Sequence, residues 1–128
     1  MTVALKKRIL IVDDEVDLVY LLTVRLKATG YDVMIARDGQ ECLEKVKTDH
    51  PDLILLDILM PKLNGYEVCR MLKDDSITAG IPIIMLTATV KQGNDLLVSS
   101  AGADSYMTKP YEMGELLHRI EALLAHPS

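Results

Sequence analysis

The chain has 128 residues, which is enough for one domain with a sizeable hydrophobic core but not for two. Hydrophobic residues make up 49% of it, a share that argues against intrinsic disorder. The net charge of -5 argues against a nucleic-acid-binding surface, and the apolar runs are too short for a membrane span or a signal-peptide core. We therefore expect a cytoplasmic chain that contacts neither nucleic acid nor membrane directly.

Short apolar runs alternate with longer amphipathic segments five times along the chain. The runs predict strands at residues 9–12, 32–36, 53–56, 83–86 and 105–107. The segments that follow them predict helices at residues 15–29, from 38 to before Pro51, and at 65–74, 93–101 and 112–125. Gly30 is expected to end the first helix, and Asp38 and Asn64 to cap the second and third. Five such units predict a parallel sheet with helices on both faces.

Polar side chains follow four of the five predicted strands. Asp13 and Asp14 come directly after the first strand, Asp57 after the third and Thr87 after the fourth. Lys109 comes two residues after the fifth. Because the carboxyl ends of parallel strands meet at one edge of the sheet, where such sheets bind ligands, we expect these five side chains to share one crevice.

The residue types in this crevice suit a metal ion and a phosphoryl group. Three ionised carboxylates repel one another unless a cation lies between them, and a site with few protein ligands suits magnesium better than calcium. Asp57 stands alone at its strand end and can act as a nucleophile that forms an acyl phosphate. Thr87 supplies a hydroxyl and Lys109 a positive charge for the phosphoryl oxygens.

Each of these residues has a simpler explanation when it is taken alone. Asp13 or Asp14 could cap a helix, Thr87 could be an ordinary strand residue, and Lys109 could be a solvated loop residue. Their joint occurrence in this order favours the shared site. Two further polar groups, the Cys42 and Cys69 thiols, lack metal-site spacing and are predicted to be reduced packing residues on helices.

On these motifs the sequence resembles the response-regulator receiver domain of two-component signalling. The resemblance covers about residues 8–125, and residues 126–128 are then a tail or the start of a linker. The matching stretches are Ile9-Leu10-Ile11-Val12-Asp13-Asp14-Glu15, Leu55-Leu56-Asp57-Ile58-Leu59-Met60-Pro61, Asn64-Gly65, Met85-Leu86-Thr87-Ala88 and Ala101-Gly102-Ala103-Asp104-Ser105-Tyr106-Met107-Thr108-Lys109-Pro110.

The resemblance implies a flavodoxin-like fold, in which a five-stranded parallel sheet of order 2-1-3-4-5 carries five helices on its two faces. It implies that Asp57 is the phospho-acceptor and that Mg2+ is held by Asp13, Asp14, Asp57 and the backbone carbonyl of Leu59. It further implies that Thr87 and Lys109 contact the phosphoryl group.

The same resemblance implies a switch. Thr87 and Tyr106 are its switch residues, and the Lys109–Pro110 peptide bond is expected to be cis. The partner is a sensor histidine kinase or a phosphotransfer protein, and the output surface is formed by the fourth helix, the fifth strand and the fifth helix. The downstream effector is unknown. The resemblance does not decide whether phosphorylation produces a homodimer, because residues 90–100 lack the charge pattern found in many DNA-binding members of the family.

The predicted function is therefore a phospho-acceptor signalling switch, which catalyses only its own phosphorylation and slow dephosphorylation. One alternative is an interaction module on the same fold that works without phosphorylation; the intact set of five polar residues argues against it. Another is an aspartyl-phosphate phosphatase of the haloacid-dehalogenase kind. Such an enzyme needs a second acid two residues after the nucleophile, where this chain has Leu59.

Overall fold

The computed structural model of this protein describes residues 6–58, 60, 63–87 and 102–125. Five parallel strands form one sheet in the order β2-β1-β3-β4-β5, which confirms the predicted strand order. The strands are β1 Arg8–Val12, β2 Asp32–Ala36, β3 Leu53–Asp57, β4 Ile83–Thr87 and β5 Ser105–Thr108. The helices are α1 Val16–Thr29, α2 Gly39–Asp49, α3 Gly65–Asp74 and α5 Met113–Ala125.

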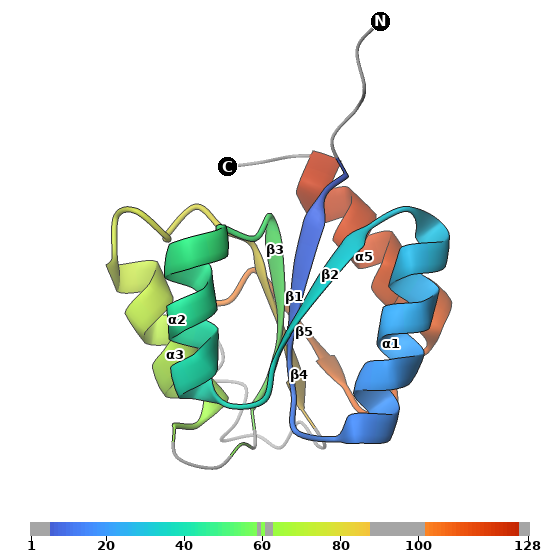
Figure 1. The fold of residues 1–128 in the computed structure, drawn as a ribbon, viewed down its shortest axis with the longest axis horizontal. Helices are drawn as coiled ribbons and strands as arrows, with labels where there is room; N and C mark the ends of the chain where they lie inside the picture. The colour runs from blue at the N-terminus through green and yellow to red at the C-terminus, as the bar shows by residue number, and fades with distance from the viewer. Residues whose placement is uncertain (1–5, 59, 61–62, 88–101, 126–128) are drawn as a thin grey trace, which may run out of the picture.

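These four helices lie on the two faces of the sheet, with α1 and α5 on one face and α2 and α3 on the other (Figure 1). The helix predicted at residues 93–101 lies outside the described residues. The observed α1 and α5 each begin one residue later than predicted, β1 begins one residue earlier, and β3, β4 and β5 each end one residue later. Within the described ranges, no helix is long and apolar enough to cross a membrane.

The continuous apolar strands form a core on both faces because successive side chains alternate across the sheet. Fully buried residues of β1, β3 and β4 divide between two clusters. The cluster under α2 and α3 contains Leu10, Val12, Ile54, Leu56, Ile83 and Met85. The cluster under α1 and α5 contains Ile9, Ile11, Leu53, Leu55, Ile84 and Leu86. The strand ends that carry the polar residues are thus fixed from both sides.

The predicted helix boundaries have the expected local causes. Gly30 follows α1 in the left-handed conformation, at φ 105°, which a glycine adopts without steric cost. The side chains of Asp38 and Asn64 accept hydrogen bonds from the backbone N–H groups of Glu41 at 2.9 Å and Glu67 at 3.0 Å. These contacts confirm the two predicted caps.

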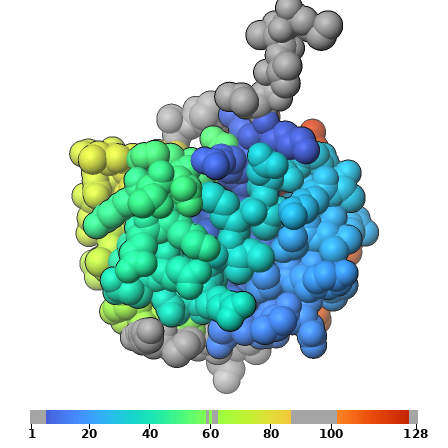
Figure 2. All heavy atoms as spheres, viewed as in Figure 1, coloured from blue at the N-terminus to red at the C-terminus, as the bar shows by residue number. Residues whose placement is uncertain are grey.

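A basic side chain from a helix reaches a backbone carbonyl of each edge strand. Lys45 of α2 donates a hydrogen bond to the carbonyl of Ile35 in β2. Arg119 of α5 donates to the carbonyl of Tyr106 in β5 at 2.9 Å. The space-filling view shows β2 at the surface between the side chains of α1 in blue and α2 in green (Figure 2).

Candidate functional site

Three carboxylates meet where β1 and β3 end. These strands are paired neighbours, with Val12 opposite Leu56, so the residues that follow them are adjacent. One carboxylate oxygen from each of Asp13, Asp14 and Asp57 lies within 4.8 Å of the others. Asp13 and Asp57 are buried, at 1% and 5% exposure, whereas Asp14 is exposed. Two of the three negative charges are therefore shielded from water.

Lys109 brings the positive charge to this cluster from the loop after β5. Its Nζ lies 3.0 Å from Oδ2 of Asp13, 3.3 Å from Oε1 of Glu15 and 3.5 Å from Oδ1 of Asp57. The peptide bond between Lys109 and Pro110 is cis. Burial alone would lower the pKa of Lys109, but its hydrogen bond to Asp13 and the charges of Asp57, Asp13 and Glu15 outweigh burial and raise that pKa. The ammonium therefore stays charged at neutral pH.

One ammonium does not balance the acids that surround it. Among the described residues, three carboxylates in a partly buried cluster, with Glu15 beside them, leave net negative charge that a divalent cation would neutralise. Carboxylate oxygens are hard ligands of the kind that magnesium prefers. The residues present therefore fit a Mg2+ ion.

The backbone around Asp57 is held by a close approach of the loop and α3. The N–H of Ile58 donates to the carbonyl of Leu86 at 3.1 Å, and the N–H of Gly65 donates to the carbonyl of Ile58 at 2.8 Å. A Cβ atom at Gly65 would lie 2.5 Å from the carbonyl oxygen of Asp57. Only glycine fits this position without displacing the backbone that carries the Asp57 carboxylate.

Comparison with known proteins agrees with this geometry. Residues 9–121 match the family described as "Response regulator receiver domain". This chain is a member of the response-regulator receiver domain family. The receiver domain is 46% identical over 120 residues to the alkaline phosphatase synthesis transcriptional regulatory protein PhoP of Bacillus subtilis, covering 94% of this chain and 49% of that protein. It is 42% identical over 120 residues to the DNA-binding response regulator MtrA of Mycobacterium tuberculosis, covering 94% of this chain and 51% of the relative.

Solved structures share the fold of this receiver domain. A putative response regulator from Chloroflexus aurantiacus has a TM-score of 0.90 at 34% identity, over 95% of this chain and 100% of that one. A CheY-like response regulator receiver domain protein from Methanospirillum hungatei has a TM-score of 0.88 at 33% identity, over 94% and 95% of the two chains. The chain spans about half the length of the curated relatives it matches.

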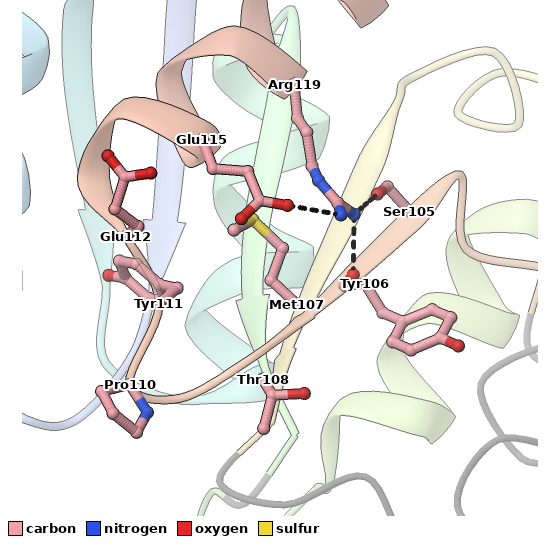
Figure 3. A pocket seen from close by; sticks show the side chains of 9 residues that line it. All are labelled: Ser105, Tyr106, Met107, Thr108, Pro110, Tyr111, Glu112, Glu115 and Arg119. Carbon is pink, nitrogen blue, oxygen red and sulfur yellow. Dashed lines mark hydrogen bonds and ion pairs between the residues drawn. The ribbon is translucent and has the colours of Figure 1, made fainter.

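The remaining predicted residues of the receiver site are described less completely. Thr87 is the last residue of β4, paired with Thr108, but its side chain lies outside what the structure describes, as does Leu59 with its carbonyl. Tyr106 lies on β5 with 40% exposure, and its ring extends away from Arg119 (Figure 3). The structure therefore brings together Asp13, Asp14, Asp57 and Lys109.

An open groove runs along β5 and α5 of the receiver domain. Its volume is about 490 Å³, and its lining includes Tyr106, Tyr111 and Arg119 (Figure 3). Arg119 also donates to the Ser105 hydroxyl at 2.8 Å and to the Glu115 carboxylate at 2.9 Å. The hydroxyl of Tyr111 is buried and has no hydrogen-bond partner among the described residues, and burial raises the pKa of Tyr111 to about 12.

Sequence reasoning missed two residues of this site. Glu15 belongs to the first matching motif and was predicted to begin a helix, but its contact with Lys109 was not predicted. Gly65 was predicted to begin a helix, but its close approach to Asp57 depends on how the loop folds back on β3. The sequence signal for Gly65 was a glycine at the start of a helix, where residues other than glycine are more usual.

Proposed function

We propose that this receiver domain is a phospho-acceptor switch, in which Asp57 takes a phosphoryl group from a phosphohistidine of a sensor histidine kinase or phosphotransfer protein. The observation that carries this proposal is the buried Asp57 carboxylate, which lies beside Asp13 and Asp14 and 3.5 Å from the Lys109 ammonium. A nucleophile, a positive charge and a set of hard metal ligands therefore converge on one point.

The transfer exchanges one bond to phosphorus for another. An oxygen of the Asp57 carboxylate forms the new P–O bond while the P–N bond to the donor imidazole breaks, and the electron pair of that bond stays on the imidazole nitrogen. Lys109 and the Thr87 hydroxyl stabilise the phosphoryl oxygens. Bound at Asp13, Asp14, Asp57 and the Leu59 carbonyl, Mg2+ would neutralise charge on the phosphoryl oxygens. The product is an acyl phosphate on Asp57.

The exposed face of α1 supports a protein donor. Val16, Tyr20 and Val24 recur every four residues and are 72%, 68% and 47% exposed, so they form one apolar stripe. A cavity of about 230 Å³ between this helix and β2 is lined by residues of the stripe and also by Asp13 and Asp14. The apolar surface is thus continuous with the acid cluster, where a phosphohistidine must arrive.

The stripe can be tested separately from the chemistry. Tyr20→Glu should slow transfer from a phosphohistidine-bearing partner protein but leave labelling by acetyl phosphate unchanged, because the small donor needs no docking surface. Met71→Glu, the same change at a half-exposed apolar residue of α3, is the control. Docking on α1 would be contradicted if both variants slowed transfer from the partner protein equally, or if Tyr20→Glu also slowed labelling by acetyl phosphate.

The output surface proposed for this switch includes β5 and α5, with Thr87 and Tyr106 as coupled switch residues. Supporting this, Tyr106 is partly exposed and borders the groove along β5 and α5. Binding of beryllofluoride with magnesium should change amide exchange in β5, and Thr87→Ala should remove that change. If exchange responds equally in the Thr87→Ala variant, the two residues are not coupled.

The central experiment is labelling with acetyl phosphate and magnesium, read by intact mass. The wild-type chain should gain one phosphoryl group, Asp57→Asn should gain none, and the exposed-acid control Asp17→Asn should behave as wild type. An adduct that persists in Asp57→Asn would refute the assignment. A wild-type chain that gains no phosphoryl group would favour the phosphorylation-independent module, and rapid turnover of the donor would favour the phosphatase.

A further inference from the structure

Glu15 is the N-cap residue of α1, a position where the side chain ordinarily accepts a hydrogen bond from the first turn of the helix. It is the residue before α1, with extended backbone angles of φ -82° and ψ 101°, and its carboxylate makes no capping hydrogen bond. Asp38 and Asn64 do cap α2 and α3. Serine, threonine, aspartate and asparagine are the preferred residues here, because their short side chains reach the free N–H groups of the first turn. The Glu15 carboxylate instead extends to Lys109.

The contact with Glu15 completes the surroundings of the Lys109 ammonium. An ammonium has three N–H donors, and three carboxylates lie within 3.5 Å of Nζ, those of Asp13, Glu15 and Asp57. Lys109 is therefore engaged in three directions in the unphosphorylated protein. A phosphoryl oxygen that contacts Nζ must replace one of these carboxylates.

The three carboxylates differ in how easily they can leave. The Asp13 side chain is 1% exposed, so releasing it from its cation leaves a buried charge, whereas Asp57, 7% exposed, becomes the acyl phosphate and stays beside Lys109 as the residue that carries the phosphoryl oxygens. The Glu15 side chain is 61% exposed, so water solvates its carboxylate when the ion pair with Lys109 breaks. Exposed ion pairs are weak, which suits a contact that must be broken in each signalling cycle.

We propose that Glu15 is a positioning residue that holds Lys109 in the unphosphorylated protein and is displaced by the phosphoryl group. The proposal rests on the function proposed above. Removing the contact should free Lys109 for the incoming group and favour the phosphorylated state. Because the contact is an exposed ion pair, we expect a gain of roughly two- to fivefold in affinity for a phosphoryl mimic.

The test compares Glu15→Gln and Glu15→Asp by calorimetric titration of beryllofluoride in the presence of magnesium. Glu15→Gln removes the charge, while Glu15→Asp keeps the charge but is one carbon too short for the Lys109 contact and can cap α1 instead. Both should bind beryllofluoride roughly two- to fivefold more tightly than wild type. If Glu15→Asp binds as wild type, Glu15 acts by repelling the anion through space, and the proposed contact is not the cause.

Two further variants separate the remaining explanations. Asp17→Asn removes a nearby exposed charge in the first turn of α1 and should leave the affinity unchanged; a gain equal to that of Glu15→Gln would overturn the proposal. In a Lys109→Met background, Glu15→Gln should give no additional gain, since the carboxylate acts through Lys109. A gain that persists there would also overturn it.

Magnesium affinity and labelling complete the design. Glu15→Gln should leave the magnesium affinity within twofold of wild type, and a larger loss would mean that Glu15 serves the metal instead. Acetyl phosphate labelling of Glu15→Gln should be faster than that of wild type at limiting donor. If wild type neither binds beryllofluoride nor is labelled, the proposed function itself fails. If wild type does both and the Glu15 variants match it, only the role of Glu15 fails.

Discussion

Replacing Gly65 with alanine tests how tightly the backbone at Asp57 is held. The new Cβ would lie 2.5 Å from the carbonyl oxygen of Asp57 and 2.8 Å from Cα of Ile58, and both are backbone atoms that cannot rotate away. Overpacking of this kind costs about 1–3 kcal/mol, while the better helix propensity of alanine returns at most about 1 kcal/mol. We expect Gly65→Ala to lower the free energy of unfolding by about 1–2 kcal/mol.

Gly114 provides the matched control because it is also a glycine in the first turn of a helix. A Cβ there would meet Oε1 of Glu112 at 2.7 Å, which is the end of a flexible exposed side chain that can move aside. Gly114→Ala should therefore keep its propensity gain and raise stability by about 0.5–1 kcal/mol.

Urea unfolding of the two variants gives the difference directly. The two should differ by about 1.5–3 kcal/mol, with equal m-values, since neither change alters the surface exposed on unfolding. Gly65→Ala should also slow labelling of Asp57 by acetyl phosphate, because the displaced carbonyl belongs to that residue. If Gly65→Ala is as stable as Gly114→Ala and is labelled at the wild-type rate, the close approach does not constrain the site.

Three further predictions concern the metal, a buried hydroxyl and the thiols. Magnesium should raise the melting temperature as its concentration rises, and at 100 times Kd it should stabilise the native state by about 2.7 kcal/mol. Asp57→Asn should raise the metal-free stability and shrink this effect, and a lower metal-free stability would contradict repulsion among the carboxylates. Tyr111→Phe should raise the free energy of unfolding by about 1 kcal/mol, because it removes a buried hydroxyl that has no partner among the described residues. If urea unfolding instead gives a lower free energy of unfolding for this variant, the hydroxyl is hydrogen-bonded. Burial raises the pKa of Cys42 to about 12 and that of Cys69 to about 11. At pH 8 about one Cys42 thiol in 10,000 and one Cys69 thiol in 1,000 is therefore ionised. Neither thiol should react with a disulfide reagent until urea unfolds the chain.

The sequence was sufficient for the sheet and for the acid cluster because both follow from apolar runs. A strand buried on both faces must be apolar throughout, so the charged residue after it marks its end, as Asp13 does for β1. Parallel order then places these ends side by side without any further information. The caps at Asp38 and Asn64 were predictable for a similar reason, because the contact involves only neighbouring residues.

The contacts that sequence reasoning missed join distant segments through exposed or backbone atoms. Glu15 and Lys109 are 94 residues apart in the sequence. The periodic pattern of apolar residues does not indicate which partner an exposed carboxylate contacts. The fit of Gly65 against Asp57 depends on tenths of an ångström in the path of the backbone, which residue patterns do not encode. Asp57 itself lies within β3 rather than after it, because its backbone still pairs with β4.

The hydrogen bonds of Lys45 and Arg119 to the edge strands affect how the molecule meets other chains. An edge carbonyl left free can pair with a strand of another molecule, which is a common route to aggregation. In β2 and β5 one such carbonyl is already taken by a cation from the adjacent helix, and in β5 the Arg119 guanidinium is held in turn by Glu115. The side chains of β5 can thus rearrange at a solvent-facing edge, while addition of a strand, the start of amyloid-like growth, is disfavoured there.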